Sequence, residues 1–224
     1  MKVNRAFRYE LKPNVSQETL LTQHAGVARF AYNWGLAQRI EIYEKEKKTT
    51  NAIEQHRILN SLKATQFPWM YEASKCAPQE ALRDLDKAFK NFFRGLQQGQ
   101  NVGFPKFKKR SYSDSFRLTG TIKIKNKEIQ LPRLGSLRLK EKSQVESKIL
   151  SATVSREADR WFVSLTVEQQ LETPLPLQGE KVGVDVGINH FSALSNGEKI
   201  CAPKPLEKKV KRLKRLSKQH TLPT

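Results

Sequence analysis

The chain has 224 residues, 38% of them hydrophobic, which is enough for two or three small packed units but long for one simple domain. Lysine and arginine total 41 against 22 aspartate and glutamate residues, and the formal charge of +19 favours a polyanionic partner, above all nucleic acid. A solvated ribosomal-type surface and a membrane-surface role stay open, but no apolar run approaches the roughly 20 residues of a membrane span.

The N-terminal residues bear on where the protein is located in the cell, and the cysteines and histidines bear on whether it binds zinc. The first ten residues contain no signal-peptide apolar stretch, so we expect the protein to stay inside the cell, without a membrane partner. Cys76 and Cys201 lie far apart and suit reduced thiols. Because no C-x-x-C pair exists and the histidines are scattered, no zinc site is expected; these histidines are His24, His56, His190 and His220.

A strand and a long helix are predicted at the start of the chain. Residues 2–12 alternate between apolar and polar side chains, and Pro13 closes the segment, as is typical of a strand. Ser16 offers an N-cap for a helix that continues to about residue 47. Within this helix, Gly26 and Gly35 are expected to be packing or kink points.

Two further helices are predicted over about residues 52–64 and 78–98. Together with the first helix they are expected to form a bundle. The last one carries an apolar stripe whose spacing is that of a buried helix face, so we expect core packing and not a platform for base stacking. The stripe consists of Leu82, Leu85, Phe89, Phe92, Phe93 and Leu96.

The texture of the sequence changes at residue 101. Residues 101–110 interleave aromatic side chains with cations, which is typical of a loop that contacts phosphates. Its candidate contacts are Lys106, Lys108, Lys109 and Arg110. Short alternating runs then predict a small β-barrel or sandwich, with strands over 116–119, 121–125, 128–131, 137–139, 149–157 and 161–168.

A linker is expected from Thr173 to Gly179, with a domain boundary near residue 178. After it, residues 181–188 predict a strand in which three valines face a core while Asp185 lies on the opposite face between two glycines. The small neighbours would let a metal ion and a phosphate approach Asp185, so a Mg²⁺ site explains the motif. A second strand over 190–194, an Asn196-Gly197 turn and a third strand over 198–201 follow, as in the opening of an RNase H-like core.

Two alternatives to this metal site stay open. Asp185 can simply cap or turn the strand end without a metal. The same Asp-x-Gly pattern also opens the phosphate-binding strand of actin-like ATPases and sugar kinases, but those proteins usually continue with Thr or Ser and begin with this strand. Here Ile188 and Asn189 follow, and some 180 basic-rich residues precede.

Over roughly residues 1–220, the chain resembles the TnpB or OrfB proteins of bacterial insertion sequences, which are relatives of type V CRISPR effectors. Five motifs in the same order carry this resemblance. They are Arg5-Ala6-Phe7-Arg8-Tyr9-Glu10-Leu11-Lys12-Pro13, Ala28-Arg29-Phe30-Ala31-Tyr32-Asn33-Trp34, Lys90-Asn91-Phe92-Phe93, Gly103-Phe104-Pro105-Lys106-Phe107 and Gly183-Val184-Asp185-Val186-Gly187.

The resemblance implies an α+β fold in which a wedge-type β-barrel carries an inserted helical lobe and is followed by the first strands of an RNase H-like (RuvC) domain. Residues 1–14 would supply the first barrel strand, 15–100 the helical recognition lobe, 101–177 the rest of the barrel and 178–224 the start of RuvC with a basic amphipathic helix. The family's proteins look like RNA-guided DNA endonucleases of prokaryotes, so the resemblance implies a cytoplasmic protein associated with the nucleoid.

The same resemblance assigns residues and partners. Asp185 matches the first catalytic carboxylate, Lys75 and Gln79 lie where the helical lobe approaches a DNA motif, and Arg117 is a wedge contact. The expected partners are a guide RNA from the transposon end and a double-stranded DNA target. Cys76 stands where a relative has an aromatic residue, so the DNA motif that is read is expected to differ.

The sequence departs from the family in its catalytic residues. Two-metal hydrolysis needs several carboxylates, and the family's later Glu and Asp and its four-cysteine zinc ribbon have no counterpart before Thr224. We therefore expect a truncated protein that is inactive alone and binds Mg²⁺ only if another polypeptide completes RuvC. The alternatives are a nuclease-dead RNA-guided DNA-binding regulator and a guide-RNA-binding module.

Overall fold

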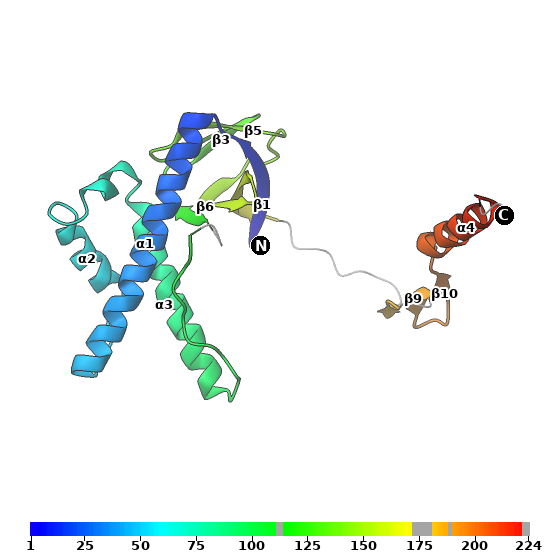
Figure 1. Cartoon of the computed structure of the whole chain (residues 1–224), viewed down its shortest axis with the longest axis horizontal. Coiled ribbons are helices and arrows are strands. Elements are labelled where there is room, and N and C mark those ends of the chain that lie inside the picture. The colour runs from blue at the N-terminus through cyan, green and yellow to red at the C-terminus, as the bar shows by residue number, and fades with distance from the viewer. Residues whose placement is uncertain (111–113, 172–180, 188–189, 221–224) are drawn as a thin grey trace. The chain divides into compact units, whose positions relative to one another are not determined.

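The computed structural model describes residues 1–110, 114–171, 181–187 and 190–220, and the predicted linker from Thr173 to Gly179 lies outside these ranges (Figure 1). The chain divides into two compact units, Met1–Glu172 and Thr173–Thr224, which are described separately below. None of the helices in the described ranges is both long enough and apolar enough to cross a membrane.

The first unit is built on a seven-stranded antiparallel sheet with the strand order β2-β6-β7-β1-β5-β4-β3. Its strands confirm the predicted β segments within a few residues. They are β1 (Lys2–Lys12), β2 (Ser115–Leu118), β3 (Lys123–Lys125), β4 (Glu128–Leu131), β5 (Gly135–Leu139), β6 (Lys148–Glu157) and β7 (Arg160–Gln170). Together with the helices, the sheet confirms the expected α+β class.

The N-terminal strand lies in the middle of this sheet. β1 pairs with β7 from Lys2 to Leu11 and with β5 through its last two residues. Tyr9 and Leu11 near the end of this strand are buried, and the Tyr9 hydroxyl accepts a hydrogen bond of 3.1 Å from the backbone N–H of Gln144. The three helices of this unit are therefore inserted in sequence between strands that pair in space.

Helix α1 (Val15–Glu46) follows β1 directly, but its N-cap is Asn14 and not the predicted Ser16. The Asn14 side chain accepts from the backbone N–H of Gln17, and the Gln17 side chain accepts from the Asn14 backbone N–H, which forms a complete capping box. Ser16 instead donates its hydroxyl to the Asn14 side chain. Asn14 is the N-cap because Gln17, three residues later, returns a hydrogen bond to its backbone N–H.

Helices α2 (Ala52–Leu62) and α3 (Cys76–Gln97) pack beside α1, and a short 3-10 helix, η1 (Pro68–Glu72), joins them. Gly35 is the contact point, because a Cβ added there would lie 2.6 Å from the Leu82 side chain and 3.1 Å from that of Leu85. The buried Gln55 side chain donates to the Gly35 carbonyl at 2.7 Å and thereby ties α2 to α1. The prediction of Gly35 as a packing point is confirmed.

The predicted apolar stripe of α3 is buried only in its first half. Leu82 and Leu85 are fully buried, whereas Phe93 and Leu96 are each 51% exposed. The expectation that the whole stripe is core was wrong, because the buried cluster includes Leu85, has Phe89 at its edge and does not extend to the last turns of α3. The second half of α3 is covered partly by the returning chain at residues 102–104.

The described residues of the second unit form three short strands, β8 (Val184–Asp185), β9 (His190–Leu194) and β10 (Lys199–Cys201), and the helix α4 (Pro205–His220). Its strands form one antiparallel sheet in the order β10-β9-β8, and Gly197 adopts a left-handed φ of 92° in the predicted hairpin turn. The expectation that Val182, Val184 and Val186 face a core was wrong, because all three are exposed. The described part of this unit places no second layer on that sheet.

Candidate nucleic-acid interface

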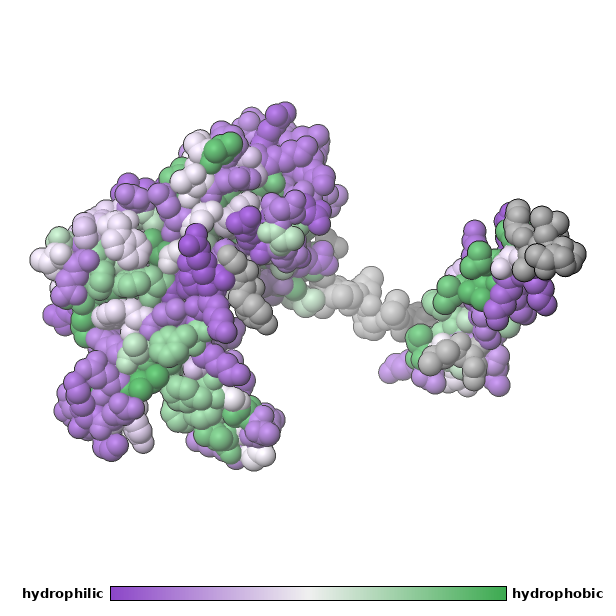
Figure 2. Space-filling view, viewed as in Figure 1, coloured by the Kyte–Doolittle hydropathy of each residue, from purple (hydrophilic) through white to green (hydrophobic). Residues whose placement is uncertain are grey.

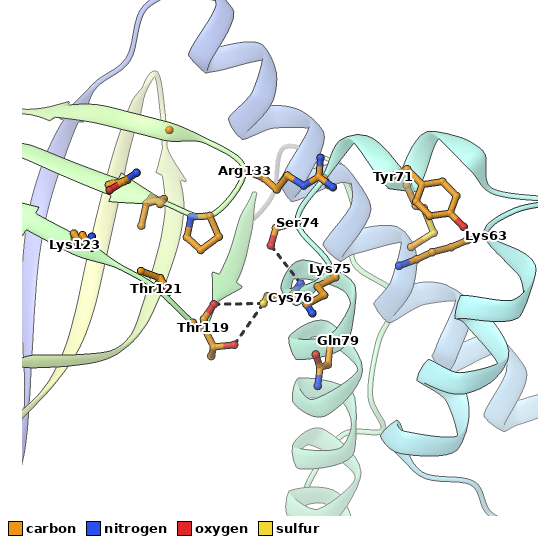
Figure 3. Close-up of a pocket in the computed structure, with 17 residues that line it drawn as sticks. Lys63, Tyr71, Ser74, Lys75, Cys76, Gln79, Thr119, Thr121, Lys123 and Arg133 are labelled. Carbon is orange, nitrogen blue, oxygen red and sulfur yellow. Dashed lines mark hydrogen bonds between the residues drawn. The ribbon is translucent and has the colours of Figure 1, made fainter.

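A groove of about 970 Å³ lies in the first unit where the start of α3 faces the β2–β5 side of the sheet (Figure 3). One wall comes from the end of α2, from η1 and from the first turn of α3. The other wall comes from the β2–β3 connection and from the turn between β4 and β5. The residues that define these walls are Lys63, Tyr71, Ser74, Lys75, Cys76, Gln79, Thr119, Thr121, Lys123, Gln130 and Arg133.

The groove is positively charged. Lys63 and Lys75 line its helical wall, and Lys123 and Arg133 line its β wall. The described residues that line it include no aspartate or glutamate. Burial lowers the pKa of Lys63, whose side chain lies largely inside the protein. Cations without neighbouring carboxylates raise the local concentration of anions, so the groove suits a phosphate backbone.

Two contacts hold the walls of the groove in place. The Cys76 thiol donates to the Thr119 carbonyl at 3.4 Å, and this bond joins the first turn of α3 to the end of β2 (Figure 3). In addition, the buried ring of His24 on α1 accepts a hydrogen bond of 3.0 Å from the backbone N–H of Ser74 at its Nε2 atom. The segment that carries Lys75 and Gln79 is thus fixed to both the helical layer and the sheet.

The structure brings together some of the residues predicted from the sequence. Lys75 is the residue that precedes α3, Gln79 lies in its first turn, and both line the groove. Lys108 and Arg117 instead line a separate cavity of about 230 Å³, which also includes Asp84. The Nε atom of Arg117 is buried without a hydrogen-bond partner among the described residues.

The loop cations differ in their freedom. Lys108 is anchored, because its backbone N–H donates to the Asn33 side chain at 2.8 Å and its carbonyl accepts from that side chain at 2.9 Å. Its ammonium lies 4.4 Å from the centre of the Tyr32 ring, and burial lowers its pKa. Lys106, Lys109 and Arg110 are exposed.

Sequence reasoning missed Lys63, Lys123 and Arg133 as groove residues. The Lys123-Ile124-Lys125 alternation placed both lysines on one face of a short strand, which was a usable signal. No sequence signal pointed to Arg133, because its position depends on the turn between β4 and β5, where its φ is 67°. Only the packing of the sheet against α3 makes these residues neighbours of Lys75.

Asp185 lies on β8 and is exposed. The backbone N–H of the neighbouring Gly183 donates to the Ser195 hydroxyl at 2.9 Å, which ties β8 to the end of β9. The described residues contain no group of three or more His, Cys, Asp or Glu side chains that could hold a metal ion. The residues present therefore do not fit a two-ion magnesium centre, and no chemical step is assigned to Asp185.

Two family models match the chain. A model of the OrfB family of IS605-type elements described as "Helix-turn-helix domain" matches residues 1–48, and one described as "Probable transposase" matches residues 164–221. The first matched segment contains β1 and α1, and the second contains the end of β7 and nearly all of the second unit.

Curated relatives cover nearly the whole chain. An Escherichia coli (strain K12) protein named as an RNA-guided DNA endonuclease, InsQ, is 33% identical over 98% of this chain, and a Streptomyces pristinaespiralis protein with the same description is 31% identical over 91% of it. The matches cover 54% and 51% of those proteins, so this chain spans about half their length. A Cas12f1–sgRNA–target DNA complex contains a chain that is 16% identical with a TM-score of 0.39, over 96% of this chain and 61% of that one.

Proposed function

Because this chain belongs to the OrfB (TnpB) family of insertion-sequence proteins, we propose that it is a nucleic-acid-binding protein related to RNA-guided DNA endonucleases. In this proposal the groove of the first unit holds double-stranded target DNA, and a guide RNA is the second partner. The large excess of basic residues supports both polyanionic partners.

The observation that carries the proposal is the groove itself, with basic side chains on both walls and no carboxylate among its described lining residues. Lys75, Lys123 and Arg133 are exposed there and can neutralise phosphates from opposite sides. On the helical wall, next to Lys75, the Gln79 amide offers a donor and an acceptor that can pair with a base edge (Figure 3). The groove thus combines positioning by charge with a group that can discriminate between bases.

The fold supports a finer assignment, which is part of the proposal. The seven-stranded sheet would be the wedge barrel, α1 to α3 the recognition lobe, and residues 178–224 the beginning of RuvC. Asp185 would then be one ligand of a magnesium site, and the further carboxylates would have to come from outside the described residues. We accordingly assign binding to this chain by itself, and DNA cleavage only to an assembly that completes the site.

The first test is the salt dependence of binding to a labelled DNA duplex. In Lys75→Ala/Lys123→Ala, the slope of log affinity against log salt should become shallower by about 2, because each lost phosphate contact removes about 0.9 from it. The matched control is Lys45→Ala/Lys48→Ala, which removes the same charge from the exposed end of α1 and should leave the slope unchanged.

Equal losses in both double variants would mean that binding follows bulk charge, and the groove assignment would be abandoned. Cleavage is tested separately by incubating the whole chain with Mg²⁺, co-purified RNA and matching DNA. The expected result is retained but intact DNA. Magnesium-dependent cutting by this chain alone would contradict the division between binding and cleavage.

A further inference from the structure

The second half of α3 and the segment that returns along it are here called the distal arm (residues 87–110). A full Schellman motif ends the helix: the N–H of Gly99 donates to the Leu96 carbonyl at 3.0 Å and that of Gln100 to the Gly95 carbonyl at 2.9 Å. Gly99 has a φ of 67°, as this motif requires. Val102 then packs directly on Gly95, where an added Cβ would lie 2.6 Å from it. The returning chain is therefore held against α3.

Aromatic rings gather along this arm, and the outer ones are about half exposed. Phe104 from the returning chain meets Phe89 and Phe92 of α3 edge to face, with ring centres 5.5 and 5.4 Å apart. Phe93 and Phe107 are 51% and 52% exposed. Figure 2 shows apolar surface over this lower part of α3. Within the described residues, no helix or strand of the first unit covers these outer rings.

The charge of the arm has one sign. From residue 87 to residue 110 the sequence contains no aspartate or glutamate, and exposed cations flank the rings at Lys90, Arg94, Lys106 and Lys109. A second copy of the chain would bring the same cations against these, which opposes self-association through the arm. A polyanion with flat apolar groups complements both features, since its phosphates meet the cations and its bases meet the rings.

We propose that the distal arm binds single-stranded nucleic acid by stacking unpaired bases on Phe93 and Phe107, while the flanking cations hold the backbone. The inference rests on the proposed nucleic-acid function but concerns a different surface from the duplex groove. A single strand is favoured over a duplex because paired and stacked bases do not present their faces to protein rings.

The test uses the whole chain and a labelled oligouridylate of about 12 nucleotides, a length within the site size of known single-strand binders. Phe93→Leu/Phe107→Leu keeps apolar bulk but removes the rings, and it should bind at least about fivefold more weakly, since each lost stack costs about 5- to 150-fold. Its slope against salt should not change, because the cations remain. Phe93→Trp/Phe107→Trp should retain affinity, and its added fluorescence should be quenched by the oligonucleotide.

Several outcomes separate the possibilities. Unchanged affinity in the leucine variant together with no quenching in the tryptophan variant would overturn the stacking assignment. A stable wild-type dimer in light scattering that Phe93→Ala/Phe107→Ala dissociates would make the arm a protein interface and overturn it as well. Parallel titrations with oligouridylate and oligothymidylate decide between RNA and DNA as the source of the strand. If Lys75→Ala/Lys123→Ala still weakens duplex binding, failure here leaves the proposed groove function standing.

Discussion

Gln79 is set among cations at the wall of the groove, and its chemistry differs from theirs. An amide can donate and accept at once and pairs well with adenine, whereas an ammonium mainly neutralises phosphate. Lys75 and Gln79 lie one helical turn apart at the start of α3 and face the same groove. Their roles can therefore be separated by substitution.

We expect Gln79→Ala to reduce discrimination between DNA duplexes by about 1–3 kcal/mol and to leave the salt dependence of binding unchanged. Lys75→Ala should weaken binding to all duplexes by a similar factor and lower the salt slope by about 1. Competition titrations with a randomised duplex pool at two salt concentrations measure both effects. Loss of affinity without any change in sequence preference in Gln79→Ala would remove this residue from base recognition.

His24 shows how a buried residue bears on the groove without reaching it. Its Nδ1 atom lies 2.7 Å from the Leu20 carbonyl and donates to it, so Nε2 is the acceptor for Ser74. Burial lowers the pKa of His24; the bond to Leu20 opposes this shift, and the charge of Arg133 adds to it. A proton on Nε2 would face the N–H of Ser74 and break the bond beside Lys75.

The lowered pKa gives His24 a defined pH dependence. Above its ordinary value of 6.5 the ring is neutral in both states, and as the pH falls below 6.5 the unfolded chain takes up a proton that the folded chain resists. The free energy of unfolding should therefore fall more steeply between pH 7 and pH 5 in the wild type than in His24→Gln, by at most about 1.4 kcal/mol per pH unit. Urea unfolding at several pH values measures this difference. Since burial also lowers the pKa of His56, the comparison with the variant is needed, and parallel curves would refute the role of His24.

At the scale of elements, α1 contains its own matched pair of glycines. Gly35 touches α3, whereas a Cβ at Gly26 would meet nothing closer than the Arg29 guanidinium at 4.0 Å. Gly35→Ala should destabilise the protein by about 1–3 kcal/mol through overpacking. Gly26→Ala should stabilise it by about 0.5–1 kcal/mol, because alanine favours the helix. Chemical denaturation measures both, and equal effects of the two changes would contradict the close contact of α1 with α3.

At the scale of the whole molecule, stability should reside in the first unit. The buried core runs from Tyr9 to Val167 and lies wholly within Met1–Glu172. We expect a chain of residues 1–172 to melt within about 2 °C of the full chain, as measured by circular dichroism. Residues 15–172 are the control and should not fold cooperatively, because β1 lies between β7 and β5 and its loss splits the sheet. A much lower melting temperature for residues 1–172 would show that the second unit contributes to the core.

Local pattern was a good guide where local forces decide the structure. The strands, the long helix, the Asn196-Gly197 hairpin and the role of Gly35 were predicted because alternation, helical spacing and turn chemistry act over a few residues. The N-cap was misplaced by two residues because Asn and Ser are both favoured cap residues, and only Asn14 has a Gln three residues later, Gln17, that completes a capping box. The ordered motifs also identified the family, since their residues and spacing are read from the sequence alone.

Tertiary structure decided which apolar stripes are covered and which cations meet. The stripe of α3 has the same helical spacing in its buried and exposed halves, so only the extent of the core formed with α1, α2 and β2 distinguishes Leu85 from Phe93. The valines around Asp185 alternate like core residues yet remain exposed, because burial depends on a second layer and not on alternation. Lys75 and Arg133 come from segments far apart in the chain, and they share a groove because the start of α3 packs against the β2 side of the sheet, where the Cys76 thiol donates to the Thr119 carbonyl. Charge and motif thus follow from sequence, whereas the site is a product of contacts between distant segments.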